Sequence, residues 1–265
     1  MSTNFILPPE FLTLAHRLAD ATHGIIRSAF RDVNLAVESK QDHSPVTAAD
    51  RDAEMAIRDI LGKERSGDGV LGEEYGHTQK ESEWQWVVDP IDGTKAFTLG
   101  RLNFGCLIGL HHEQHGFVLG IADQAIVNDR WVGIKNGGAT RNGQVIHAAK
   151  QTTITGSHIA ITNPTRLPHA MHKMHDAIYD AVKIMNYGGN FLNYTGIADG
   201  LVHATFEAAQ GIYDVAALVP LITEVGGVVT EIDGSMLTLN SKADRTLAAC
   251  TPQLHAELLT LYKSF

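Results

Sequence analysis

The stretch that decides the fold runs Trp86-Val87-Val88-Asp89-Pro90-Ile91-Asp92-Gly93-Thr94-Lys95-Ala96-Phe97. Its first part, Trp86 to Val88, is apolar and β-branched, which predicts a buried strand. Pro90 removes a backbone donor, so we expect the strand pairing to end there. Gly93 and Thr94 then open a predicted short helix that runs from Thr94 to Leu99. Two carboxylates, those of Asp89 and Asp92, are therefore expected on a stiff turn beside a helix N-terminus.

This turn combines groups that suit a metal ion and a phosphate. Carboxylate oxygens favour a hard cation such as Mg²⁺. The backbone N–H groups of Gly93 and Thr94 favour a phosphate oxyanion at the start of the helix. The stretch thus indicates a metal-assisted phosphate site. The alternative is a strand that ends in an Asp-Pro turn, with Asp92 as an ordinary helix N-cap.

Four blocks of the chain, in the same order, resemble the inositol monophosphatase family. They are Lys40 with Ser44-Pro45-Val46-Thr47-Ala48-Ala49-Asp50; Gly72-Glu73-Glu74; Asp89 to Phe97; and Tyr213-Asp214-Val215-Ala216-Ala217 with Glu224-Val225-Gly226-Gly227. The resemblance implies an α+β fold, the layered α-β-α-β-α sandwich of that family. It also implies a phosphatase of small phosphorylated metabolites, and a homodimer.

The resemblance further implies a role for each residue of the site. Glu73, Asp89 and the carbonyl of Ile91 would hold one Mg²⁺ ion. Asp89, Asp92 and Asp214 would hold a second, and Glu73 would touch a third through water. Thr94 and Asp50 would take the proton of the attacking water, and the N–H groups of Gly93 and Thr94 would hold the phosphate. Glu74 and Lys40 would support the residues that contact the metal ions and the phosphate. Each acid alone could equally be an N-cap or a surface carboxylate, but four unpaired acids gathered in one place would repel without cations.

Composition limits the other functions open to the chain. It has 265 residues, of which 44% are hydrophobic, enough for one large domain or two lobes. We expect lobes at 1–150 and 151–265, both contributing to the site. The net charge of −9 argues against nucleic acid or an anionic membrane as a partner. We see no signal peptide in the first residues and no apolar run long enough to span a membrane, and we expect Cys106 and Cys250 to be buried free thiols. Together these features predict a cytoplasmic protein.

The rest of the chain alternates between recognisable elements. Helices are predicted at 8–30, from Thr47 or Asp50 onward, and at 168–181, 190–200, 214–225 and 252–262. Strands are predicted at 35–37, 70–71, 104–110, 117–122, 130–134, 158–162, 182–185, 201–206, 228–230 and 246–249. Polar loops are predicted at 41–45 and 77–83.

One cluster of histidines falls outside these motifs. His169, His172 and His175 recur every three residues on the helix predicted at 168–181. They could ligate zinc, but this spacing winds around the helix, and we see no Cys or acid that would complete a closed set. The sequence therefore favours a solvated polar face.

Within the family, residues 91–101 and 213–220 look most like the histidinol-phosphate phosphatase branch. The first alternative is an inositol-1-phosphate phosphatase, and an alternative of another class is a non-catalytic binding protein that keeps the fold. Glu207 stands where family members carry a carboxylate that meets the organic part of the substrate. Asn190 stands where the histidinol-phosphate branch has an acid, and Gly211 where that branch usually has a lysine. Glu207 and Asn190 are our predicted substrate contacts.

Overall fold

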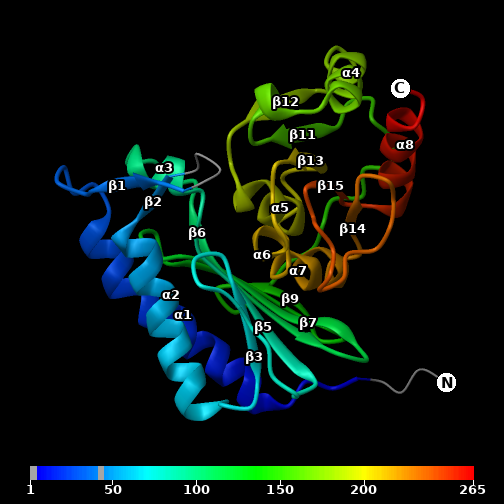
Figure 1. The fold of residues 1–265 in the computed structure, drawn as a ribbon. Coiled ribbons are helices and arrows are strands. Elements are labelled where there is room, and N and C mark those ends of the chain that lie inside the picture. Colours follow the sequence, from blue (N-terminus) through cyan, green and yellow to red (C-terminus); the bar gives the residue numbers. More distant parts are fainter. Residues whose placement is uncertain (1–4, 41–44) are drawn as a thin grey trace.

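Two β-sheets and the helices that cover them make up the molecule (Figure 1). The computed structural model describes residues 5–40 and 45–265. Helices α1 (Pro9–Ala29) and α2 (Ala48–Glu64) cover one face of an eight-stranded sheet. Helices α5 (Phe191–Ala198), α6 (Ile212–Val215) and α7 (Leu218–Glu224) lie between that sheet and a five-stranded one. Helices α4 and α8 cover the outer face of the smaller sheet. The predicted α-β-α-β-α sandwich is therefore confirmed.

The large sheet carries the stretch quoted above. Its strands, in spatial order, are β10 (Gln144–Val145), β9 (Gly138–Arg141), β8 (Asp129–Ile134), β7 (Gly116–Gln124), β6 (Gly105–His112), β5 (Trp84–Asp92), β3 (Gly69–Gly72) and β4 (Gly76–Thr78). Strand β5 pairs with β6 on one side and β3 on the other, and its residues Trp86 to Val88 are fully buried. This explains why the sequence there is an unbroken apolar run rather than an alternating one.

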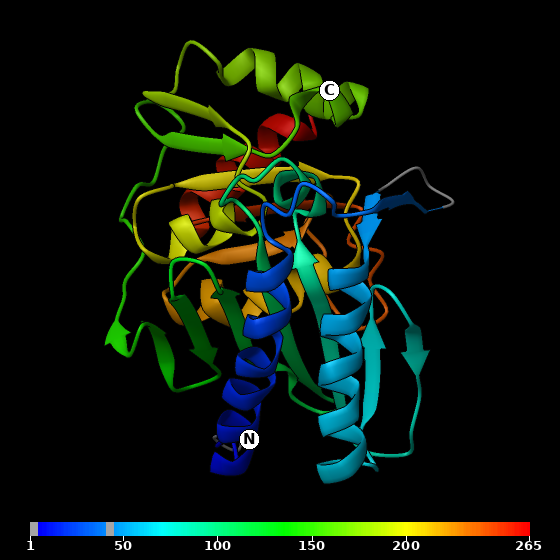
Figure 2. The same ribbon diagram turned by 90° about the vertical axis from the view of Figure 1, so that its left-hand side faces the viewer.

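Two helices lie side by side across the outer face of this sheet (Figure 2). These are α1 (Pro9–Ala29) and α2 (Ala48–Glu64). The segment between them contains the strands β1 (Val37–Ser39) and β2 (Pro45–Thr47), which pair with each other in antiparallel fashion. Their apolar faces, with Leu18 and Ile57 fully buried, form a core with the large sheet. The hairpin delivers the chain to the N-terminus of α2, where Asp50 lies.

The small sheet forms the second half of the molecule. Its strands, in spatial order, are β12 (Ile184–Tyr187), β11 (His158–Ile161), β13 (Ala204–Ala208), β15 (Arg245–Ala249) and β14 (Val228–Glu231). The helices around it are α4 (His169–Ile178), α5 (Phe191–Ala198), α6 (Ile212–Val215), α7 (Leu218–Glu224) and α8 (Pro252–Tyr262), with a 3₁₀ turn at Pro164–Arg166 between β11 and α4. The short helix α3 (Thr94–Thr98) follows β5 of the large sheet. One continuous core joins Val87 of the large sheet to Phe206 of the small one. The division of the chain at residue 150 stays a prediction.

A row of three glycines lets the middle helices approach the large sheet. Gly109, Gly120 and Gly133 are direct cross-strand neighbours on β6, β7 and β8. A Cβ atom at Gly120 would lie 1.8 Å from the carbonyl oxygen of Ala217, and one at Gly133 would lie 2.5 Å from the backbone nitrogen of Leu221. Only glycine fits at such a contact between a sheet and helix backbone. The row therefore sets how closely α6 and α7, and with them Asp214, approach β5.

Several element boundaries differ from the prediction. Pro90 does not end β5: pairing is interrupted by a bulge between Asp89 and Asp92 and resumes opposite Gly105. The single helix predicted at 214–225 is two helices, α6 and α7, and Asp214 lies inside α6 while Gly211 is its N-cap. Part of the loop predicted at 77–83 belongs to β4. The loop predicted at 41–45 lies outside the described residues except for Pro45.

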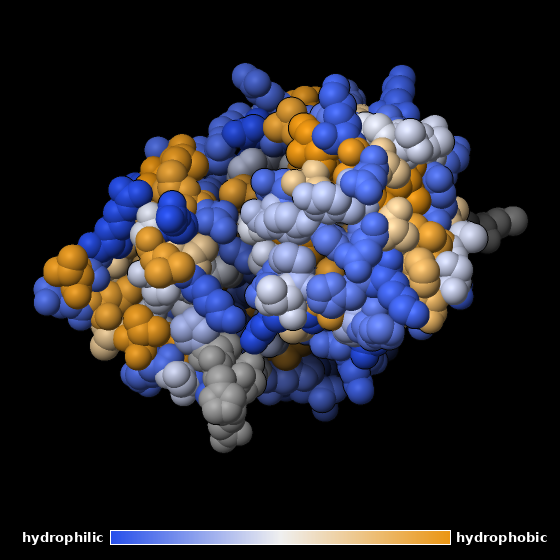
Figure 3. All heavy atoms as spheres, turned by 90° about the horizontal axis from the view of Figure 1, so that it is seen from above, coloured by the Kyte–Doolittle hydropathy of each residue, from blue (hydrophilic) through white to orange (hydrophobic). Residues whose placement is uncertain are grey.

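The surface gives little sign of a large apolar patch on the face seen in Figure 3, where hydrophilic residues predominate and hydrophobic ones form scattered groups. Among residues 5–40 and 45–265, no helix has the length and apolar character to cross a membrane. Cys106 and Cys250 are both buried and free, as predicted. The homodimer stays a prediction.

Candidate active site

Three acids meet where β5 ends and α6 begins. One carboxylate oxygen from each of Asp89, Asp92 and Asp214 lies within 4.8 Å of the others. The Oδ1 atom of Asp89 accepts a hydrogen bond from the N–H of Ile91 at 3.0 Å, whereas its Oδ2 atom is buried without a hydrogen-bond partner among the described residues. A buried carboxylate oxygen without a partner is costly. Such an oxygen beside two other acids fits a metal ion as the missing partner.

The pKa values of these three acids are raised, as expected for carboxylates that are buried close to one another. Burial raises the pKa of Asp89 well above its usual value, and the neighbouring charges of Glu73 and Asp214 raise it further. Burial and the charge of Asp214 likewise raise the pKa of Asp92. The pKa of Asp214 rises to about 6, chiefly because the group is buried. Cations that bind between these groups would restore their charged forms.

Glu73 lies next to this cluster, on a turn whose acidic side chains are contacted by Lys40. Burial raises the pKa of Glu73, and the charge of Asp214 adds to the effect. The Nζ atom of Lys40 donates to Glu73 at 2.8 Å and to Glu74 at 2.7 Å. Burial also raises the pKa of Glu74, to about 7. Lys40 therefore bridges the two acids, and the supporting role predicted for Lys40 and Glu74 stays a prediction.

The residue that fixes this turn was missed by the sequence analysis. Glu54, fully buried on α2, accepts hydrogen bonds from the N–H groups of Glu74 at 2.8 Å and Tyr75 at 3.2 Å. Arg58, one helical turn later, pairs with the Glu54 carboxylate at 2.7 Å. In the sequence both resemble an exposed i, i+4 helix pair, so no signal distinguished them. The structure shows instead that α2 anchors the turn carrying Glu73.

Thr94 and Asp50 lie in direct contact. The Thr94 hydroxyl donates to Asp50 Oδ1 at 3.1 Å and also lies 3.3 Å from the carbonyl oxygen of Ile91. The other oxygen of Asp50 accepts from the N–H and hydroxyl of Thr47, at 2.9 and 2.6 Å, in a capping box at the start of α2. Burial raises the pKa of Asp50 above its usual value. The pair is thus fixed in place and adjoins the carbonyl predicted to face a metal.

The rim of the site depends on two unusual backbone conformations. Gly93 has φ of 87°, and a Cβ there would lie 2.4 Å from Asn190 Nδ2. Asn190 itself has φ of 51°, precedes α5, and donates from its side chain to the carbonyl of Asn103. The next residue, Phe191, donates its N–H to Asp92 at 2.7 Å. The segment at Asn190 is therefore tied directly to an acid of the cluster.

A small cavity of about 150 Å³ opens beside Asp92 and Asp214, and Asn190 and Glu207 line it. Glu207 is 3% exposed, and its Oε1 atom accepts from Thr162, Asn193 and Thr205. Among the described residues its Oε2 atom accepts only from the N–H of Thr162, so that oxygen keeps capacity for a further hydrogen bond.

Two basic residues of this cavity were not assigned from the sequence. Lys95 and Arg166 both line it. Lys95 follows Thr94 directly, so its place could have been inferred from the motif. Arg166 lies on a 3₁₀ turn after β11, and only the fold brings it to the site. Together they give the acidic cavity a rim of positive charge.

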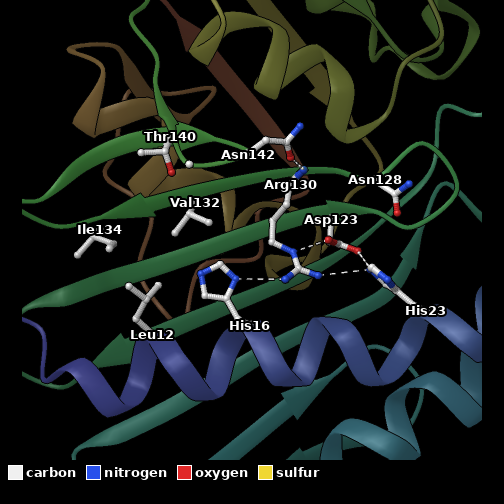
Figure 4. A pocket seen from close by; sticks show the side chains of 11 residues that line it. Leu12, His16, His23, Asp123, Asn128, Arg130, Val132, Ile134, Thr140 and Asn142 are labelled. Carbon is white, nitrogen blue, oxygen red and sulfur yellow. Dashed lines mark hydrogen bonds and ion pairs between the residues drawn. The ribbon is translucent and has the colours of Figure 1, made fainter.

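A second cavity, of about 460 Å³, lies between α1 and the strands β7 to β9 (Figure 4). It contains none of the acids above. Its one arginine, Arg130, is engaged by the carboxylates of Asp123 and Asp20 and by the ring of His16. That guanidinium is therefore already engaged by acidic side chains and is not free to bind a phosphate.

The layered fold, a cluster of buried acids with an unpartnered oxygen, and an adjoining Thr–Asp pair define the class of metal-dependent phosphatases that hydrolyse phosphate monoesters. Residues 8–264 match the inositol monophosphatase family, and the chain belongs to that family.

Known proteins of two kinds resemble the chain. A histidinol-phosphatase of Mycobacterium tuberculosis is 33% identical over 94% of this chain and 96% of its own length. A chloroplastic bifunctional phosphatase, IMPL2, of Arabidopsis thaliana is 34% identical over 85% of this chain, which spans 65% of that protein. The solved structure of an inositol monophosphatase from Zymomonas mobilis is 38% identical, covers 96% of this chain and 98% of its own, and superposes with a TM-score of 0.85.

Proposed function

We propose that the protein is a Mg²⁺-dependent phosphatase of histidinol phosphate, with inositol-1-phosphate as the second candidate substrate. The observation that carries the metal dependence is the buried Oδ2 atom of Asp89, which has no hydrogen-bond partner among the described residues and lies beside Asp92 and Asp214. Two or three ions fit the charge of the set. Glu73, Asp89 and the Ile91 carbonyl would hold one, Asp89, Asp92 and Asp214 another, and Glu73 would reach a third through water.

When bound, Mg²⁺ would neutralise the acids and the phosphate oxygens and make water a better nucleophile near neutral pH. The chain supplies the proton path. Thr94, which donates to Asp50, can accept a proton from the attacking water as its own proton passes to Asp50. Burial raises the pKa of Asp50, so its carboxylate holds the transferred proton more tightly than an ordinary aspartate would.

The other residues bind and orient the phosphate ester. The N–H groups of Gly93 and Thr94, at the start of α3, are the proposed donors to the phosphate. Lys40 keeps Glu73 and Glu74 in place. Lys95 and Arg166 on the cavity rim add positive charge where the phosphate ester enters.

The choice of histidinol phosphate rests on Glu207 and on the relatives named above. The Oε2 atom of Glu207 has capacity for a hydrogen bond from an ammonium or hydroxyl group of the leaving alcohol. Asn190, in place of an acid, reduces the negative charge that would attract an amine. Glu207 preserves part of it, and a histidinol-phosphatase matches the chain over nearly its whole length.

The test is kcat/KM for both substrates in the same Mg²⁺ buffer, alongside the Glu207→Gln variant and a generic aryl phosphate. We expect histidinol phosphate to be the faster substrate, and Glu207→Gln to lose more on it than on the aryl phosphate. A higher kcat/KM for inositol-1-phosphate would reverse the substrate assignment. Equal losses on both esters would remove Glu207 from substrate recognition.

A further inference from the structure

A second group of possible metal ligands lies on α4, on the outer side of the small sheet. One ligand atom from each of His172, His175 and Asp176 lies within 4.8 Å of the others. The sequence offered no Cys or acid to complete a closed set of four ligands with these histidines, and the structure places Asp176 beside two of them, which makes a set of three. His169, which the sequence grouped with these histidines, is not part of the cluster. The three positions span i, i+3 and i+4, so they share one face of the helix.

We propose that His172, His175 and Asp176 form a zinc site on α4, separate from the acidic cluster of the active site. Two imidazole nitrogens and one carboxylate oxygen are a ligand set that zinc uses when it keeps a fourth position for water. His172 is partly exposed and Asp176 is exposed, with 76% of its side chain accessible, so both side chains can turn to close the distances.

The geometry of His175 favours ligation by a defined nitrogen. Its side chain is only 12% exposed, and its Nδ1 atom lies 2.9 Å from Asp176 Oδ1. Its Nε2 atom lies 2.7 Å from the hydroxyl oxygen of Tyr187 on β12. When Nε2 carries the proton and donates it to Tyr187, the Nδ1 lone pair points toward Asp176. A hydrogen bond on the far nitrogen is the usual way in which proteins orient a metal-binding imidazole.

The place of the cluster on α4 also favours a cation. The helix ends at Ile178, so all three ligands lie in its last two turns. The C-terminal end of a helix carries partial negative charge, and the carboxylates of Asp176 and Asp180 add to it. A divalent ion bound there would offset this unfavourable charge.

The ligands distinguish this site from the active site. Imidazole nitrogens suit zinc, whereas Mg²⁺ prefers oxygen ligands. None of the three ligands lines the cavity beside Asp92 and Asp214. Saturating Mg²⁺ should therefore leave the α4 site free for zinc.

The experiment measures zinc bound per chain by equilibrium dialysis of the full chain in saturating Mg²⁺. We compare the wild type with His172→Ala and Asp176→Asn, and use His169→Ala on the same helix as the matched control. The buried face of α4, Met171, Met174 and Ile178, is untouched by these substitutions. We expect wild type and His169→Ala to bind one more zinc ion per chain than His172→Ala or Asp176→Asn. Equal zinc in wild type and His172→Ala would overturn the proposal.

Two further readouts keep the test independent of any single variant. Zinc should raise the Tm of the wild type and of His169→Ala more than that of His172→Ala, because a ligand that binds only the folded state stabilises it. Tyr187→Phe should keep the site but weaken zinc about 10- to 100-fold, since the partner that orients His175 is lost. The same Tm increase in His172→Ala as in the wild type would contradict the assignment, and unchanged affinity in Tyr187→Phe would contradict the orienting role of Tyr187.

Discussion

Replacing Gly120 on β7 with alanine should damage the active site indirectly, by displacing the helix that carries Asp214. The added Cβ would lie 1.8 Å from the carbonyl oxygen of Ala217, on the backbone between α6 and α7. An ordinary C···O contact is about 3.3 Å or longer, so the two segments must separate by about 1.5 Å. The atoms nearest to the added Cβ belong to the backbone of Ala217 and not to a flexible side chain. The clash can therefore be relieved only if the backbone moves.

The expected cost follows from that displacement. Overpacking of this kind lowers the free energy of unfolding by about 1–3 kcal/mol. Asp214 lies on α6, just before Ala217, and would move away from Asp89 and Asp92. Misplacement of a catalytic group by about 1 Å can lower the rate about 10²-fold, so we expect a loss in kcat of that order.

The assay combines urea unfolding with Mg²⁺-dependent phosphate release from an aryl phosphate. Gly62→Ala is the matched control, because a Cβ at Gly62, inside α2, meets nothing within 4 Å. Alanine there should leave kcat unchanged and stabilise the helix by about 0.5–1 kcal/mol. If Gly120→Ala kept wild-type kcat and wild-type stability, the glycine row would not set the position of Asp214.

Three further predictions concern the site itself. Thr94→Ala should lower kcat about 10²-fold or more with little change in KM, because the hydroxyl acts in proton transfer; a changed KM with unchanged kcat would argue for a binding role instead. Glu54→Ala should lower the free energy of unfolding by about 3–5 kcal/mol, measured in urea, because Arg58 loses its buried partner; a loss below 1 kcal/mol would mean that the turn at Glu74 is held in another way. In EDTA, the free energy of unfolding should fall as the pH rises from about 4 to 7, since native Asp89 has a raised pKa and binds protons more tightly than the unfolded chain does. Saturating Mg²⁺ should reduce this pH-dependent loss of unfolding free energy in the wild type, and Asp89→Asn should show a smaller loss in EDTA. The raised pKa of Asp89 would be contradicted if, in EDTA, the free energy of unfolding rose over this pH range in the wild type but not in Asp89→Asn.

The acids of the site could be predicted because short motifs carry them. Asp89, Asp92 and Thr94 lie within six residues, and the strand before them is apolar enough to be recognised. The partnership of Thr94 with Asp50, across 44 positions, followed from the family resemblance and not from spacing. The fold class was accessible in the same way, because four blocks in order pointed to one architecture.

What could not be predicted depends on contacts between distant elements. Successive glycines of the row are 11 and 13 residues apart along the chain, yet their common role appears only when β6, β7 and β8 are in register. The sequence alone suggests that Glu54 is a solvated helix acid. The structure shows that the turn at Glu74 packs against it and buries it. The sequence did carry a signal for the split of α6 from α7: Pro220, in the first turn of α7, lacks the N–H that a continuous helix would donate to the carbonyl of Ala216.

The most direct test of the account is phosphate release by wild type and Asp89→Asn over a Mg²⁺ titration, with EDTA as the zero point. We expect no turnover of the wild type in EDTA and full recovery on adding Mg²⁺. For Asp89→Asn we expect a loss of about 10³-fold or more at saturating Mg²⁺, because a charge shared by the proposed ions is removed. Wild-type turnover by Asp89→Asn at saturating Mg²⁺, or undiminished turnover of the wild type in EDTA, would contradict the assignment of the acidic cluster as a catalytic metal site.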